Sequence, residues 1–268
     1  MVTSMEHLRA IRWQTKHVAA PRRIVIEGSG ATGTHLRRIC QVLLFAMAFC
    51  LTATTVSSAA DDSTTKYFAQ LRQRRLFSLA EGYCLSRLSE GKLSQGRRTQ
   101  LTIELSRTLS EHARFTSGQE QTELWQRATA AIDELLKSSP QNPRRLLLQT
   151  QRALSLAAQG EHLRWQVELF PYDETLKPRA VAAFDQAILQ LKESEKEAAE
   201  QLRKTGRRRS ADADALSPYE LRSLTNHLGF QIGQALVERA KLDPAGSPDR
   251  VATLMEAESW LSRLAKRS

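Results

Sequence analysis

Three glycines in the N-terminal sixty residues have the spacing of a nucleotide-binding motif. Gly28, Gly30 and Gly33 fit the pattern G-x-G-x-x-G and follow the short apolar run 24–26. Between a strand and a helix, such glycines let the backbone approach the pyrophosphate of a dinucleotide. The pattern also needs an acidic residue about 20 positions further on, but after these glycines none occurs before Asp61. We therefore predict that the glycines bind no dinucleotide, and we expect no cofactor.

The residues after 60 hold three histidines and one cysteine, which are His112, His162, His227 and Cys84. Glu161-His162 has no second histidine four residues on, so the spacing does not favour a zinc site. His112 shares a predicted helix face with leucines, which favours a half-buried, hydrogen-bonded side chain. Cys84 lies on an apolar face, where a cysteine behaves as a small buried hydrophobe. These residues indicate no catalytic or metal-binding cluster, and we do not expect an enzyme.

A cluster of basic residues is the sharpest local charge feature, and it consists of Arg203, Lys204, Arg207, Arg208 and Arg209. It adjoins a predicted flexible loop at about 204–217. Such a cluster is typical of a solvated loop, but it could also contact an acidic partner or anionic lipid headgroups. No aromatic residue is interleaved, so the cluster does not resemble a stacking platform for single-stranded nucleic acid.

An uncharged stretch at 39–60 determines which residues belong to the folded domain. Arg37-Arg38 precedes it, and its apolar core, 42–56, is densest over Val42–Leu51. About ten apolar residues suit the central region of an export signal, whereas about 20 are needed to span a bilayer. The signal cleavage region is predicted at Ser58, Ala59, Ala60 and Asp61. The sequence thus predicts a leader, 1–60, and a domain, 61–268, in the periplasm or cell envelope. An uncleaved membrane anchor through 39–60 and a buried cytosolic helix are the alternatives.

Removal of this leader changes the charge of the protein. The whole chain has 39 basic and 29 acidic residues, a net charge of +10. Residues 1–60 hold seven of the basic and two of the acidic ones, so residues 61–268 keep 32 and 27. A net charge of about +5 weakens the case for a nucleic-acid partner. With Cys40 and Cys50 removed, no disulfide can form within the mature chain.

About seven amphipathic helices are predicted after residue 60, and no strand. They cover about 65–90 and 94–115, a stretch after Ser117, 142–167 and 178–204, and stretches after Ser217 and Ser247. Ser117 and Ser217 each precede a glutamate by three residues, as in a capping box. Asn142 is predicted to cap a helix with Pro143 in its first turn. Gly229 and Gly233 form a GxxxG step that favours close packing of two soluble helices.

Three blocks of the sequence echo one another and indicate stacked helix pairs. The block 80–88 aligns with 128–136 and with 184–191 through small and apolar residues at matching positions. The segment 135–143 is similar to the end of a tetratricopeptide repeat, although the blocks lie 48 and 56 residues apart and not about 34. The resemblance implies an all-α fold of antiparallel helix pairs stacked as a tetratricopeptide-like α-solenoid. It also implies a scaffold that binds a peptide or protein along a concave surface, and it assigns no catalytic residue.

The sequence therefore predicts a non-catalytic helical-repeat scaffold, exported or membrane-tethered, that mediates protein–protein interaction. One alternative is an all-helical exported enzyme whose polar residues meet only in three dimensions. The other is a cytosolic nucleic-acid binder that uses the basic cluster at 203–209. The partner and the oligomeric state are not indicated by any residue.

Overall fold

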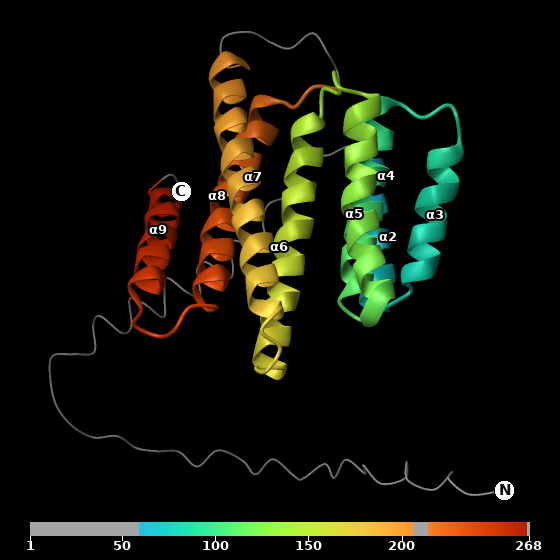
Figure 1. Ribbon diagram of the computed structural model, residues 1–268. Helices are drawn as coiled ribbons and strands as arrows, with labels where there is room; N and C mark the ends of the chain where they lie inside the picture. The colour runs from blue at the N-terminus through green and yellow to red at the C-terminus, as the bar shows by residue number, and fades with distance from the viewer. Residues whose placement is uncertain (1–58, 206–213, 267–268) are drawn as a thin grey trace, which may run out of the picture. The chain divides into compact units, whose positions relative to one another are not determined.

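The computed structural model describes residues 59–205 and 214–266 (Figure 1). These residues form eight α-helices and no β-strand, which confirms the all-α class for this part of the chain. The helices are α2 (Ala59–Gln73), α3 (Phe77–Ser89), α4 (Gln95–Ala113), α5 (Gly118–Ser138), α6 (Arg145–Leu169), α7 (Leu176–Thr205), α8 (Pro218–Ala240) and α9 (Pro248–Ala265). Several predicted features lie outside the described residues: the glycine pattern at 28–33, the apolar core at 42–56, Ser58, Arg207, Arg208 and Arg209.

The prediction of a single first helix over 65–90 is wrong, because the chain forms two helices there. Arg75 adopts φ 57°, and its amide donates to the carbonyl of Arg72 at 2.8 Å. The amide of Leu76 donates to the carbonyl of Leu71 at 2.9 Å. These two bonds and the left-handed residue form a Schellman turn, which ends α2. The expected seven helices thereby become eight, and α9 has α8 as its partner.

Serine side chains open three helices by accepting hydrogen bonds from otherwise free backbone amides. Ser94, Ser217 and Ser247 each accept from the amide three residues on. Ser217 also forms the predicted capping box, because the Glu220 carboxylate accepts from the Ser217 amide at 2.8 Å.

Two other predicted caps are wrong. Ser117 makes no capping bond with its side chain, and the next residue, Gly118, enters α5 with φ 70°. Asn142 does not begin α6, which starts at Arg145, so Pro143 lies before the helix. The Asn142 side chain instead accepts from the amide of Arg144 at 2.8 Å and donates to Thr99 Oγ1 at 2.9 Å. It is 2% exposed and joins the start of α6 to α4.

Each helix packs against the next one in the chain, and successive helices alternate in direction (Figure 1). The helices α2, α4, α6 and α8 have a second set of contacts, because each also packs against the next of these four. We call these four helices the even row. The helices α2 and α4 run parallel, because Arg97 of α4 donates to Thr64 of α2 at 3.3 Å near their starts and Arg72 pairs with Glu111 at 3.2 Å near their ends.

The apolar core lies mainly in two clusters. One cluster joins α2, α3, α4 and α5 around Phe68, Leu101 and Leu109. The other joins α6, α7, α8 and α9 around Phe184, Leu228 and Ile232. A small third cluster with Ile132 and Leu148 lies between α5 and α6.

The GxxxG step of α8 allows α9 to approach closely, as the sequence predicts. A Cβ added to Gly229 would lie 3.0 Å from Leu264 Cδ2, and one added to Gly233 would lie 2.7 Å from Leu261 Cδ2. Real Cβ atoms do not come within 3.0 Å of another heavy atom, so a larger residue at 233 would displace Leu261.

We predict that Gly233→Ala lowers the free energy of unfolding by about 1 to 3 kcal/mol, because the new methyl group overpacks the α8–α9 contact. The matched control is Gly82→Ala in α3, where an added Cβ meets no atom within 4 Å. This control should raise the free energy of unfolding by up to about 1 kcal/mol through helix propensity. Urea unfolding followed by circular dichroism measures both. Similar effects of the two substitutions would contradict the close α8–α9 packing.

Candidate interaction surfaces

A buried carboxylate in the middle of α4 connects it with α2. Glu104 is 1% exposed, and its Oε2 accepts a hydrogen bond from Nη1 of Arg72 at 2.5 Å. Its Oε1 accepts from Nη1 of Arg107 at 3.2 Å. Arg72 is itself buried and also pairs with Glu111 through Nε at 3.2 Å. An unpaired charge at this depth would cost several kcal/mol, so the pairing holds α2 and α4 in one register.

Polar side chains also join α4 to α6. Arg107 Nε donates to Gln151 Oε1 at 2.9 Å. Ser155 Oγ lies 3.1 Å from Ser106 Oγ and 3.0 Å from Ser110 Oγ, and all three serines are buried. Because these hydroxyls bond to one another and not to a histidine, they do not form an activated nucleophile.

The contact between α6 and α8 has a buried ion pair of its own. Arg164 is 5% exposed, and its Nε lies 2.9 Å from Glu238 Oε2. The same guanidinium pairs with Glu168 and lies 4.6 Å from the ring centroid of Trp165. We call the polar contacts between helices of the even row the polar seam. The seam fixes the relative positions of the helices.

Cys84 and two of the histidines contribute to packing, whereas His227 is exposed on α8. His112 is half-buried as predicted, but its Nδ1 has no hydrogen-bond partner, and the ring stacks on Phe77 with centroids 4.9 Å apart. His162 Nε2 lies 2.9 Å from Gln121 Nε2, and burial and then the nearby Arg114 lower the pKa of this imidazole.

Desolvation, followed by repulsion from Arg107, lowers the pKa of His227. Cys84 is fully buried, as predicted, and burial, with a further contribution from Glu104, raises the pKa of its thiol to about 12. This thiol therefore stays protonated. Glu161 pairs with Arg114 at 3.5 Å, so the carboxylate next to His162 already has a cationic partner.

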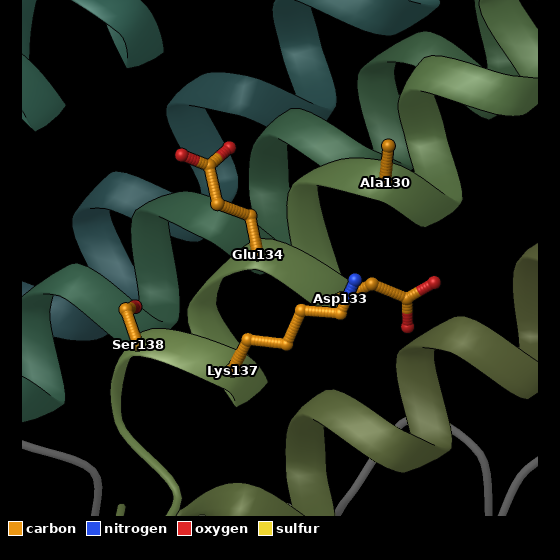
Figure 2. A pocket seen from close by; sticks show the side chains of 5 residues that line it. All are labelled: Ala130, Asp133, Glu134, Lys137 and Ser138. Carbon is orange, nitrogen blue, oxygen red and sulfur yellow. The ribbon is translucent and has the colours of Figure 1, made fainter.

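A hollow of about 610 Å³ lies over the second half of α5 and is lined by Ala130, Asp133, Glu134, Lys137 and Ser138. All five residues belong to one helix, and Figure 2 shows that the Asp133 and Glu134 carboxylates point in different directions. Asp133 is paired with Arg152 of α6 at 2.7 Å. Side chains that diverge from a single helix do not converge on a ligand, so we assign no site to this hollow.

The described part of the predicted basic cluster lies at the end of α7. Arg203 and Lys204 are exposed there, in its last turn. The first residue of α6, Arg145, is exposed and lies 3.9 Å from Glu197 of α7. The structure therefore brings the basic start of α6 to the basic end of α7, although the two lie about 60 residues apart in the sequence.

Arg144 joins this region to the residues before α8. Its Nε donates to the carbonyl of Asp214 at 3.0 Å. A Cβ added to Gly96, near the start of α4, would lie 3.1 Å from the Asp214 carboxylate. The starts of α4, α6 and α8 therefore lie at one end of the even row, together with the end of α7. We call this end the basic end.

Apolar side chains are exposed where α6 passes into α7, and these are Trp165 (48% exposed), Leu169 (70%), Phe170 (59%) and Tyr172 (96%). We call these four residues the aromatic tip. Exposed acidic residues are their neighbours in the sequence, namely Glu168, Asp173 and Glu174, and the exposed Lys177 and Arg179 follow. Hydrogen bonds from Thr175 lower the pKa of Asp173, so this carboxylate stays ionised. The tip lies at the opposite end from the basic end, because α6 begins at one and finishes at the other.

Sequence reasoning missed the polar seam and the aromatic tip. Arg72 and Glu104 are 32 residues apart, a separation that gives no local pattern. A signal did exist for the tip, because Leu169, Phe170 and Tyr172 are apolar residues placed in a helix-breaking segment, where no helix face can bury them.

Comparisons with protein-family models, with curated proteins and with solved structures find no match to this chain. In the described ranges, no helix is both long and apolar enough to cross a bilayer. The same residues contain no group of three or more histidine, cysteine, aspartate or glutamate side chains able to hold a metal ion.

We predict that Glu104→Gln lowers the free energy of unfolding by about 3 kcal/mol, because it leaves the buried Arg72 guanidinium without its closest anion. Glu134→Gln on the exposed face of α5 is the matched control and should change this quantity by less than about 0.5 kcal/mol. Denaturant unfolding at neutral pH measures both. A loss in Glu104→Gln no larger than in the control would show that the seam does not stabilise the fold.

Proposed function

We propose that this protein is a non-catalytic helical scaffold, exported or tethered to a membrane of the bacterial envelope, which binds a protein partner through the aromatic tip. The observation that carries the proposal is the exposure of Leu169, Phe170 and Tyr172 between two well-packed helices. Exposed apolar side chains that gather in one place are typical of protein-binding surfaces.

The contact pattern of the helices supports the scaffold interpretation. Each pair of consecutive helices repeats the same relationship, in which the even helix contacts the next even helix and the odd helix packs against its neighbours in the chain. This repeated relationship supports the proposed tetratricopeptide-like stacking of helix pairs. The echoed blocks at 80–88, 128–136 and 184–191 lie on α3, α5 and α7, which occupy equivalent places in this pattern.

The chemistry of the tip defines its partner. Apolar side chains next to Glu168, Asp173 and Glu174 in the sequence fit an apolar cleft whose edge carries lysine or arginine. Tyr172 is 96% exposed, so it can enter such a cleft without rearrangement of the scaffold. Trp165, with Arg164 against its ring, supports the base of the tip.

The predicted leader, 1–60, supports a location outside the cytoplasm, and the N-terminus of the protein from fractionated native cells tests this prediction. We predict either a chain that starts at Ala60 or Asp61 outside the cytoplasm or an intact chain in the membrane fraction. Cleavage after Ala60 would remove only the first two residues of α2. Intact mass or terminal sequencing measures the start. An intact chain in the cytosol would contradict export and tethering.

We predict that a photo-crosslinking amino acid at Tyr172 gives one discrete adduct in native cells, because this side chain enters the partner. The same amino acid at Gln126, on the exposed face of α5, is the control and should give none. Phe170→Ser should abolish the adduct at 172 while the circular dichroism stays unchanged. Equal adducts at both positions, or an adduct that survives Phe170→Ser, would contradict docking at the tip.

A further inference from the structure

Six cations from three helices gather at the basic end, and these are Arg97, Arg98, Arg144, Arg145, Arg203 and Lys204. Arg145, Arg203 and Lys204 are exposed, and the other three are half-buried. The hydrogen bonds already described place them together, because Arg144 reaches the residues before α8 and Asn142 reaches Thr99 in the first turns of α4.

The opposite end exposes charges of both signs. The first turns of α5 and the connection from α6 to α7 expose Glu120, Glu123, Glu168, Asp173 and Glu174, and Arg74, Lys177 and Arg179 are exposed at that end as well. At the basic end, Glu197 pairs with Arg145, and the carbonyl of Asp214 accepts from Arg144. A cluster of six cations attracts an anionic surface.

The start of α2 lies at the basic end. Arg97 donates to Thr64 Oγ1 at 3.3 Å, and Gln100 donates to Thr65 Oγ1 at 3.4 Å. Both threonines belong to the first turns of α2, which begins at Ala59. The apolar stretch 42–56 precedes this helix by only a few residues of sequence. A chain tethered through that stretch would be tethered from its basic end.

We propose that the basic end binds anionic phospholipid headgroups, so that the scaffold stands on the membrane with its aromatic tip away from it. This inference rests on the proposed tethering of the chain. A membrane fits better than an acidic protein or a nucleic acid, because the helix that follows the apolar stretch in the sequence begins at the same end as the cations. Tyr219, in the first turn of α8, is 59% exposed at this end and has the amphipathic ring that favours the headgroup layer.

Vesicle flotation with the full chain tests the inference. The two vesicle types contain phosphatidylcholine alone, or phosphatidylcholine with about one third phosphatidylglycerol. Because the apolar stretch could insert into both, the informative quantity is the ratio of the two affinities. A cation near an anionic membrane contributes about 1 kcal/mol, which corresponds to a factor of about five. We predict that Arg145→Gln/Arg203→Gln/Lys204→Gln lowers affinity for the anionic vesicles about a hundredfold, with little change for the neutral ones.

The matched control removes three exposed cations from the other end, as Arg74→Gln/Lys177→Gln/Arg179→Gln. Both variants have the same net charge. If the preference for anionic over neutral vesicles depended only on total charge, it would fall equally in both variants. Equal losses, or equal binding of the wild-type chain to both vesicle types, would overturn the inference.

Two further outcomes would show either that the basic end binds another ligand or that only the proposed partner site at the tip is wrong. Tighter binding of the wild-type chain to duplex DNA than to the anionic vesicles at the same salt concentration would assign the basic end to nucleic acid and overturn the inference. If the tip fails its crosslinking test while the vesicle result holds, the proposed scaffold function fails and the lipid surface stands. The two proposals therefore fail by separate measurements.

Discussion

The buried carboxylate of Glu104 is the interaction on which the rest of the structure depends. Two arginines donate hydrogen bonds to it, Arg72 from α2 and Arg107 from its own helix. Arg107 in turn binds Gln151 of α6, so three helices of the even row share one connected set of polar contacts. Apolar packing tolerates small sliding of one helix along another, whereas a buried ion pair does not. The seam therefore sets the register along which the two apolar clusters pack.

Two kinds of contact stabilise the structure, apolar packing within each half and hydrogen bonds between the halves. The apolar clusters on either side supply most of the burial, with Phe68 at the centre of one and Phe184 at the centre of the other. Between them, α4 and α6 meet largely through serines, Gln151 and Asn142. Each half can thus keep its own core while hydrogen bonds of defined geometry determine how the halves join.

The fold class could be predicted from the sequence because its signals are local. The Ser217–Glu220 capping box, the apolar face around Cys84 and the GxxxG step all lie within one or two helical turns. The turn at Arg75 could not be predicted, because glycine normally occupies the left-handed position and an arginine gives no such signal. The pairing of Arg72 with Glu104 depends on the tertiary fold that follows this turn. The apolar periodicity continues through it, so a single helix was the natural prediction.

The turn at Arg75 also determines which end of the array receives the N-terminal segment. A single helix over 65–90, antiparallel to α4, would begin at the end where the aromatic tip lies. With the turn, α2 runs parallel to α4 and begins beside Arg97. One backbone conformation therefore moves the start of the first described helix from the end with the aromatic tip to the basic end. With one helix fewer, the proposed tether and the proposed partner surface would lie at the same end.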